Sequence, residues 1–249
     1  MDNYIFGIRT VLEAIKAGKE IDKIIVSSDI KGILINELFA EIKKQKINFQ
    51  YVPIEKINKI TKNNHQGVIA YISPIQYYNL EEVLETLAEN DIVPLFIILD
   101  QITDVRNFGA ITRTCECANI NAIIIPKQGS VRITEDAIKT SAGALFNMPV
   151  CQVDNLTDTV LLLKQYNYQI VAATEKTDTL IYDCDFTKPT AIIMGSEEFG
   201  ISKQLLKNSD SIVKIPIFGK TESLNVSVST AIVIYEAIRQ RNVKSGNKL

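Results

Sequence analysis

From Val93 onward, the chain has the hydrophobic pattern of an α/β domain. Short apolar runs alternate there with longer segments whose apolar residues recur at helical spacing. We expect strands at 95–99, 122–125, 150–153, 169–173, 191–194 and 212–215, and helices at 109–118, 134–141, 157–165 and after residue 225. Nearly continuous apolar strands separated by helices indicate a parallel sheet that is covered on both faces.

Residues 1–73 alternate between strand and helix over shorter distances, which indicates a separate, small α/β unit. We expect helices at 7–17, 33–45 and 54–60, and strands at 24–27, 49–53 and 68–72. Pro74 then ends the last strand, and Asn79 is placed to cap an acidic helix at 80–89. The sequence therefore predicts a first domain at 1–73, a linker at 74–92 and a second domain at 93–249.

Composition and charge limit the compartment and the partners that we expect. No apolar run approaches the length of a membrane span, and no long apolar segment of a signal peptide follows Met1. We therefore expect a cytoplasmic protein without a membrane partner. The net charge is −2, so a polyanion would bind only at a local patch. Arg106, Arg113 and Arg132 lie close together in the sequence and could form such a patch.

The scarcity of histidine limits the chemistry, because His65 is the only histidine of the chain. Ser-His-Asp or Cys-His catalysis would have to use His65, and a histidine-rich zinc or iron site is not expected. The four cysteines are scattered, and we expect buried free thiols and no metal. His65 itself lies in the polar loop 62–67, where it could contact RNA or anchor the loop.

Three polar turns that contain glycine follow predicted strands and could carry chemistry. The first, at 100–113, contains Asn107, Gly109 and Arg113, and it enters a helix whose N-terminus would attract an anion. In this interpretation Gly109 allows a close approach of the backbone, and Arg113 lies about one turn into the helix, near the anion. The alternative is that Asn107 only caps the helix and that Arg113 is solvated.

The other two turns also have a functional and a structural interpretation. The turn at 195–200 contains Glu197, which could simply be a helix-start carboxylate favoured by the helix dipole. The third segment contains Ile215, Ser223 and Asn225, and its two polar residues could cap the final helix. No G-x-G-x-x-G run follows a strand, and no P-loop is present, so the nucleotide-binding fingerprints are weak.

Taken together and in this order, the three turns resemble the motifs of the SpoU/TrmH family of S-adenosylmethionine-dependent RNA ribose 2′-O-methyltransferases. The N-x-G-x-x-x-R of 107–113 is similar to the first motif, the G-x-E-x-x-G of 195–200 to the second, and the I-P-x and S-L-N-V-S of 215–227 to the third. The first domain opens with F-G-I-R-T-V-L-E-A-I and closes with H-Q-G-V-I-A, and it resembles the L30e-like RNA-binding domain of the RlmB branch. The resemblance therefore covers the whole chain.

The resemblance implies a fold and a set of site residues. It implies an α/β-knot domain, with a deep trefoil knot at about 190–235, that follows the L30e-like domain. The residues that match the family's cofactor contacts are Thr174, Gly195, Ile215 and Leu224. Those that match its catalytic machinery are Arg113, Asn107, Glu197, Ser223 and Asn225. The candidate RNA contacts are Arg106, Arg132 and His65.

The resemblance also implies a reaction and partners. We expect S-adenosylmethionine-dependent methylation of a guanosine ribose 2′-hydroxyl in 23S ribosomal RNA by a homodimer, without a metal. An alternative substrate is tRNA. An alternative of another class is a catalytically inactive RNA-binding or ribosome-assembly protein.

Overall fold

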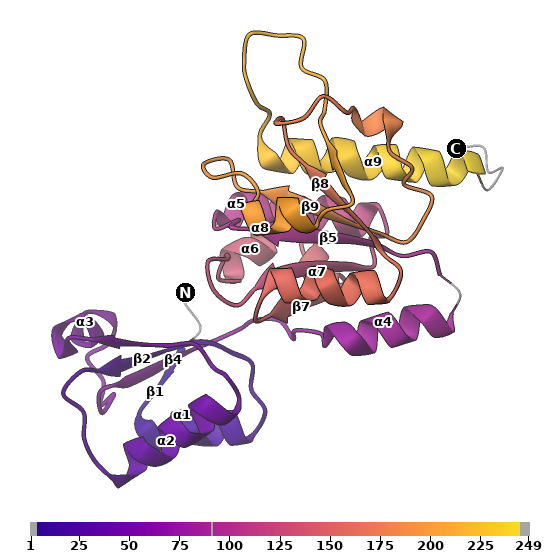
Figure 1. The fold of residues 1–249 in the computed structure, drawn as a ribbon. Helices are drawn as coiled ribbons and strands as arrows, with labels where there is room; N and C mark the ends of the chain where they lie inside the picture. Colours follow the sequence, from indigo (N-terminus) through magenta and orange to yellow (C-terminus); the bar gives the residue numbers. More distant parts are fainter. Residues whose placement is uncertain (1–3, 91, 245–249) are drawn as a thin grey trace. The chain divides into compact units, whose positions relative to one another are not determined.

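The structure is a computed structural model that describes residues 4–90 and 92–244. The described chain divides into two compact units (Figure 1). The first contains the residues up to Gln76 together with Arg132–Glu135, and the second contains Tyr77–Val131 and the described residues from Asp136 onward. Residues 1–3, to which the expectation of no signal peptide refers, lie outside the described residues.

The first unit is a four-stranded mixed sheet with helices on both faces. Its elements are β1 (Tyr4–Phe6), α1 (Ile8–Lys16), β2 (Ile21–Ser27), α2 (Ile33–Lys44), β3 (Phe49–Val52), α3 (Ile54–Ile60) and β4 (Val68–Ile72). The strand order is β1-β4-β2-β3, with β2 parallel to β3 and antiparallel to β4. One cluster of buried side chains joins α1 and α2 to the sheet, and a second cluster joins α3 to it. The predicted helices and strands are confirmed, and β1 is an additional strand.

The second unit is built on a six-stranded, fully parallel sheet, as its hydrophobic pattern predicts. Its strands are β5 (Leu95–Asp100), β6 (Ala122–Pro126), β7 (Val150–Val153), β8 (Gln169–Ala173), β9 (Thr190–Gly195) and β10 (Ser211–Val213). Its helices are α4 (Leu80–Glu89), α5 (Val105–Cys117), α6 (Glu135–Thr140), α7 (Leu156–Gln165), α8 (Lys203–Asn208) and α9 (Val226–Lys244), with short 3₁₀ turns η1 (Ala144–Phe146) and η2 (Ile181–Asp183). The strand order is β10-β8-β9-β5-β6-β7. The trefoil knot that the resemblance implies stays a prediction.

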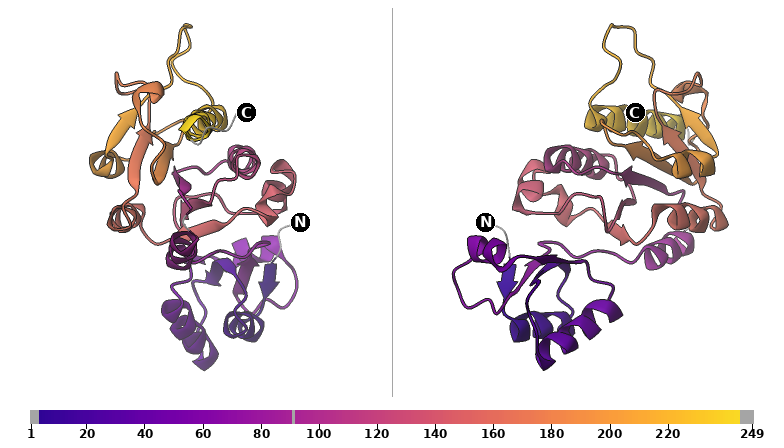
Figure 2. Two further views of the ribbon diagram at one scale, coloured as in Figure 1. Left: turned by 90° about the vertical axis from the view of Figure 1, so that its right-hand side faces the viewer. Right: turned by 60° about the vertical axis from the view of Figure 1, so that its left-hand side comes forward.

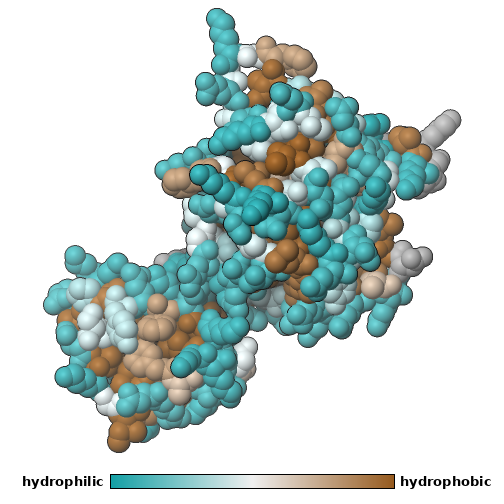
Figure 3. Space-filling view, viewed as in Figure 1, coloured by the Kyte–Doolittle hydropathy of each residue, from teal (hydrophilic) through white to brown (hydrophobic). Residues whose placement is uncertain are grey.

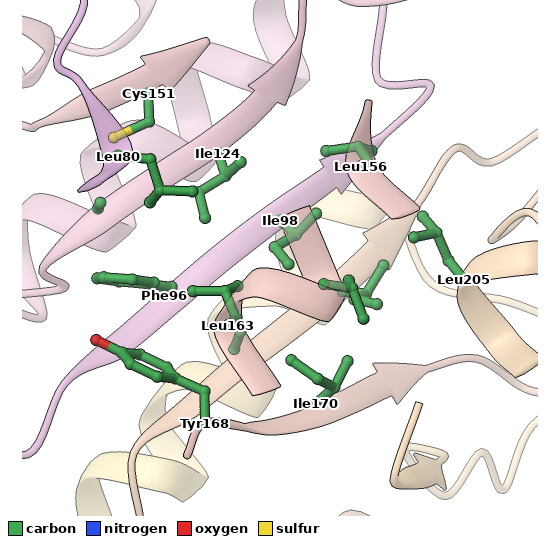
Figure 4. Close-up of a cluster of buried hydrophobic side chains, with 14 of the residues drawn as sticks. Leu80, Phe96, Ile98, Ile124, Cys151, Leu156, Leu163, Tyr168, Ile170 and Leu205 are labelled. Atoms are coloured by element: carbon green, nitrogen blue, oxygen red, sulfur yellow. The ribbon is translucent and has the colours of Figure 1, made fainter. Parts of the chain in front are cut away.

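Helices cover both faces of this sheet (Figure 2). On one face, α4, α7 and α8 pack onto alternate residues of the strands and form the main buried cluster (Figure 4). Phe96 and Tyr168 stack within this cluster, with ring centroids 5.0 Å apart. Burial of each large apolar side chain of this kind stabilises the fold by roughly 1.5–3 kcal/mol. Because both faces of the sheet are covered, both sets of side chains along each strand are apolar, which explains the continuous apolar runs of the sequence.

The predicted helix at 80–89 and its cap are confirmed. The side chain of Asn79 accepts hydrogen bonds from the N–H groups of Glu81 and Glu82. Leu80 and Leu84 of this helix are buried in the main cluster of the second unit. An amphipathic helix must bury its apolar stripe, so this part of the segment 74–92 belongs to the core of the second unit.

The longest helix, α9, carries no membrane signal. Within residues 4–90 and 92–244, no helix combines the length and the apolar character needed to cross a membrane.

Arg241 fastens the end of α9 to the amino-terminal edge of the parallel sheet. Its Nε donates a hydrogen bond to the carbonyl of Phe186 at 2.9 Å, and its Nη1 donates to that of Val93 at 2.8 Å. Its Nη2 donates to the carbonyls of Pro94 and Lys188, at 3.0 and 2.9 Å. Burial lowers the pKa of Arg241 because it disfavours the charged form. These four acceptors come from the segments that lead into β5 and β9.

The substitution Arg241→Ala should lower the free energy of unfolding of the second unit by about 3 kcal/mol, because several carbonyls lose a charged donor. Urea titration followed by circular dichroism measures this change. The exposed Lys207, which has no ion pair in the described chain, provides the control, and Lys207→Ala should change stability by less than about 0.5 kcal/mol. Equal unfolding midpoints for the two variants would contradict this role of Arg241.

Candidate active site

The carboxyl ends of three neighbouring strands, β10, β8 and β9, lie at one edge of the sheet, and each strand continues into a polar segment. In parallel sheets this edge is where small-molecule sites form. A cavity of ≈ 290 Å³ lies here. Its lining comes from residues 173–176 at the end of β8, from 194–201 at the end of β9, and from Ile215, Ile217, Glu222, Ser223, Leu224, Val226 and Ser229 after β10.

One wall of the cavity is the turn that follows β9, and Gly195 makes this turn possible. A Cβ at Gly195 would lie 2.2 Å from the carbonyl carbon of Gly200, closer than any real side chain could approach. The turn closes through a hydrogen bond from the N–H of Gly200 to the carbonyl of Ser196, at 2.8 Å. Gly200 has φ +68°, which favours glycine. The cavity wall is therefore made of backbone that folds back on itself.

A carboxylate in this turn joins three segments that are far apart in the sequence. Oε1 of Glu197 accepts hydrogen bonds from Nδ2 of Asn225 at 2.7 Å, from the N–H of Val226 at 3.1 Å and from Nδ2 of Asn107 at 3.4 Å. Nδ2 of Asn225 also donates to Oδ1 of Asn107 at 3.0 Å. The structure thus brings together three of the five predicted catalytic residues.

Asn225 has a structural and a connecting role at the same time. Its Oδ1 accepts hydrogen bonds from the N–H groups of Ser227 and Val228, at 3.0 and 3.4 Å, and so caps α9. Its Nδ2 meanwhile points to Glu197 and Asn107. The two interpretations of Asn225 are therefore compatible.

Helix α5 begins earlier than the sequence predicts. Oδ1 of Asp104 accepts hydrogen bonds from the N–H groups of Arg106 and Asn107, at 2.8 and 2.9 Å, so Asp104 is the N-cap. The interpretation of Asn107 as the cap is wrong, because Asp104 lies one turn earlier and satisfies these donors. The side chain of Asn107 is consequently available to the network of Glu197.

The close approach that Gly109 allows is to a neighbouring helix. A Cβ at this buried position would lie 2.6 Å from Cβ of Thr140, on α6. The absent side chain thus allows α5 to approach α6 closely. Gly109 serves helix packing in the second unit.

Arg106 and Arg113 lie on an exposed face of α5. They are seven residues apart, which is two helical turns, so both point to the same side of the helix. No hydrogen bond or ion pair holds either guanidinium within residues 4–90 and 92–244. Neither arginine lines the cavity of its own chain. The structure therefore leaves both cations open to a ligand, without bringing Arg113 into the pocket.

The predicted cofactor residues Thr174, Gly195, Ile215 and Leu224 all line the cavity, and Ser223 lines it with them. Their roles stay predictions. Sequence reasoning missed other lining residues, among them Glu175, Lys176, Phe199, Glu222 and Ser229. The signal for the first two was available, because both directly follow Thr174 at the end of a predicted strand.

His65 lies in the first unit as a loop anchor. Its ring is buried, and its Nδ1 accepts a hydrogen bond from the N–H of Gly67 at 2.9 Å. Its Nε2 lies 2.8 Å from Oδ1 of Asn58. These bonds support the interpretation of His65 as a loop anchor, and a contact between His65 and RNA stays a prediction.

Arg132 also belongs to the first unit. Its guanidinium carbon lies 4.2 Å from the ring centroid of Tyr71, a cation–π geometry. Arg132 is thus partly engaged within the first unit. A contact between Arg132 and RNA stays a prediction.

The cysteines offer no activated nucleophile. Cys115, Cys151 and Cys184 are buried and unpaired, as expected, and only Cys117 is exposed. Burial raises the pKa of Cys151 to about 12 and also raises that of Cys115. The chemistry of the site therefore depends on the carboxylate, amide, hydroxyl and guanidinium groups described above.

Comparison with known families separates the chain into two matching parts. Residues 94–235 match the model of the SpoU rRNA Methylase family. Residues 4–78 match the model described as RNA 2′-O ribose methyltransferase substrate binding.

Relatives match over nearly the full length of the chain. A Staphylococcus saprophyticus protein assigned to the TrmH family of tRNA/rRNA methyltransferases is 36% identical over 238 residues, which is 96% of each chain. The 23S rRNA (guanosine-2′-O-)-methyltransferase RlmB of Blochmanniella floridana is 34% identical over 249 residues, with 99% of this chain and 98% of that protein covered. The crystal structure of the SpoU methyltransferase AviRb from Streptomyces viridochromogenes, in complex with AdoMet, has the same fold, with a TM-score of 0.61, 19% identity and coverage of 96% and 90%.

The substitution Glu197→Ala should loosen the first turn of α9, because Asn225 and Val226 lose their common acceptor. A loss of about 1.5 kcal/mol corresponds to roughly tenfold faster amide exchange in this turn. Hydrogen–deuterium exchange of a peptide covering the start of α9 measures it. The neighbouring Glu198 lacks these bonds, and Glu198→Ala is the control, so equal exchange in the two variants would contradict the role of Glu197.

Proposed function

This chain belongs to the SpoU rRNA methylase family of RNA 2′-O-ribose methyltransferases, and on that premise we propose that its cavity binds S-adenosylmethionine. The cavity volume of ≈ 290 Å³ is near the lower end of the range for small-molecule sites. The backbone wall at Gly195, which a Cβ would fill, and the apolar Ile215 and Leu224 suit an adenosine held mainly by backbone groups. The related AviRb was crystallised in complex with AdoMet.

The hydrogen-bond network of Glu197 at the N-terminus of α9 would orient the acceptor nucleotide. Bound in the cavity, S-adenosylmethionine would supply an electrophilic methyl group on a good leaving group. The ribose 2′-hydroxyl must then lose its proton and be held in line. We propose that Asn107, Glu197, Ser223 and Asn225 position this nucleotide, a role that their convergence beside the cavity supports.

Arg113 would act by charge. A guanidinium stays protonated at neutral pH, so it is better suited to bind the adjacent phosphate and stabilise the developing alkoxide than to remove a proton. Its exposed and unpaired position on α5 is consistent with this role. Arg106, two turns away on the same face, would bind a further phosphate.

We propose that the active form is a homodimer. Neither Arg113 nor Arg106 lines the cavity of its own chain, so we expect a second copy to supply the cations. Exposed apolar side chains lie on α9 and on the loop before it: Phe218 is 95% exposed, Tyr235 53% and Val228 47%. Tyr235 and Val228 are seven residues apart and share one face of α9. This surface is suited to bury against a second copy.

The proposed substrate is a guanosine ribose of 23S ribosomal RNA, which would place the protein in the cytoplasm. Two observations support this substrate: the match of residues 4–78 to a substrate-binding family and the 34% identity to RlmB over 99% of the chain. A tRNA substrate is the second candidate, because the description of the S. saprophyticus relative covers both RNAs. The assembled Asn107–Glu197–Asn225 network and the exposed Arg113 of the same unit favour an enzyme over an inactive RNA-binding protein.

Deletion of the gene should remove one 2′-O-methylguanosine from 23S ribosomal RNA and leave every tRNA methyl group in place. Mapping of 2′-O-methylation in total RNA from the deletion strain measures this, and re-expression of the intact chain should restore the methyl group. Loss of a tRNA methyl group would replace the proposed substrate by the second candidate.

The substitution Arg113→Ala should lower methyl transfer at least about 100-fold, because the developing charge loses its stabilising cation. The affinity for S-adenosylmethionine, measured by calorimetry, should change less than about twofold, because Arg113 does not line the cavity. Arg106→Ala, which removes only the proposed phosphate contact, should mainly raise KM. Turnover of Arg113→Ala within a few-fold of the wild type would show that Arg113 is not catalytic.

A further inference from the structure

We propose that Phe39, Phe49 and Tyr51 of the first unit form a platform on which unpaired bases of the substrate RNA stack. Phe49 and Tyr51 lie on β3, and Phe39 lies on α2. The inference rests on the proposed function, because it identifies the surface by which this RNA methyltransferase holds its substrate. These three residues are called the aromatic platform.

The three rings form one connected cluster. The ring centroids are 5.4 Å apart for Phe39 and Phe49, 5.8 Å for Phe39 and Tyr51, and 5.5 Å for Phe49 and Tyr51. Phe49 and Tyr51 point to the same side of β3, because side chains alternate along a strand. The mutual edge and tilted contacts hold each ring in a defined orientation.

The aromatic platform is unusually exposed for an apolar cluster. Phe49 is 43% and Tyr51 54% exposed, although both belong to a strand of the sheet. The strand β3 is the edge of this sheet, so no further strand covers its outer side. Hydrophobic residues reach the surface of the first unit in Figure 3. An exposed apolar cluster of this kind marks an interaction site.

The charges around the platform favour a polyanion. Lys43 lies one turn after Phe39 on the same side of α2, and it is exposed and unpaired in the described chain. The acidic residues of α2 are neutralised, since Glu37 pairs with Lys16 at 2.9 Å and Glu41 pairs with Lys44 at 3.8 Å. The cation nearest to Phe39 along this side of the helix is therefore available to a phosphate.

The first unit as a whole carries the opposite charge balance to the complete chain. Residues 1–76 contain 11 lysine and arginine residues and 8 aspartate and glutamate residues, which gives +3, whereas the chain has a net charge of −2. A positive unit that exposes aromatic rings fits single-stranded RNA, because bases stack on such rings while phosphates meet the cations. Paired bases in a duplex would have no free face to offer.

A single tryptophan tests stacking directly, because the chain contains none. In the full-length Tyr51→Trp variant, a single-stranded RNA of about 12 nucleotides should quench the tryptophan emission in a saturable way. A duplex of the same sequence should quench it much less. The matched control is Tyr182→Trp, because Tyr182 is exposed to a similar extent, 55%, but belongs to the second unit. Its emission should not respond to the RNA.

The double substitution Phe49→Leu with Tyr51→Leu keeps apolar contact with Phe39 but removes two stacking faces. It should weaken the binding of the same single-stranded RNA about tenfold or more, with an unchanged circular dichroism spectrum. Unchanged affinity in a variant that still transfers methyl groups would overturn the platform and leave the proposed function standing. A wild type that transfers no methyl group to RNA would overturn the proposed function, and quenching would still decide whether the platform binds RNA.

Two further results would overturn the platform. Equal quenching by duplex and single strand would show that unpaired bases are not what this surface recognises. A change in the emission of Tyr51→Trp with protein concentration alone would show that a second copy of the chain covers the rings.

Discussion

Oε1 of Glu197 holds together three parts of the second unit that the sequence separates by up to 118 residues. It accepts hydrogen bonds from the turn into α9 and from the first turn of α5, and it lies itself at the end of β9. The geometry depends on Gly195, because only a residue without Cβ allows the turn after β9 to fold back. At the other end of α9, Arg241 donates hydrogen bonds to four backbone carbonyls and so holds the helix in place. Both ends of α9 are therefore attached to the sheet by polar groups. The cavity lies beside the N-terminal end of α9.

The cavity and the exposed arginines lie in different parts of the second unit. Backbone and small or apolar side chains form the cavity at the ends of β8, β9 and β10, which suits a ligand recognised by shape. The cations stand outside it on α5, where they can reach a polyanion. The Glu197 network lies between the two, since it joins the cavity wall to the first turn of α5. In the proposed reaction, this junction is where the donor and the acceptor nucleotide meet.

Most of the fold could be predicted from the sequence, because burial on both faces gives continuous apolar strands and helices show a regular period. The parallel sheet, the small α/β unit and the α4 cap at Asn79 all follow from such local signals. The start of α5 does not follow from local signals, because Asp104 and Asn107 are both good N-cap residues and only the folded geometry selects between them.

The site residues show the same limit. The convergence of Asn107, Glu197 and Asn225 depends on strand order, which hydrophobic periodicity does not contain, and it was expected only through the family motifs. The partners of Gly109 and His65, which are Thr140 and Asn58, could not be predicted, because packing and loop geometry set them. The aromatic platform could not be predicted from the sequence, because an exposed aromatic residue on a strand has the same local sequence pattern as a buried one.

The most direct test of the account is the fate of a labelled methyl group. The purified protein is incubated with methyl-labelled S-adenosylmethionine and unmodified 23S ribosomal RNA, and the RNA is digested to nucleosides and separated by chromatography. The account predicts that the label is recovered in 2′-O-methylguanosine. Label in a base-methylated nucleoside, or no label in any RNA, would contradict it.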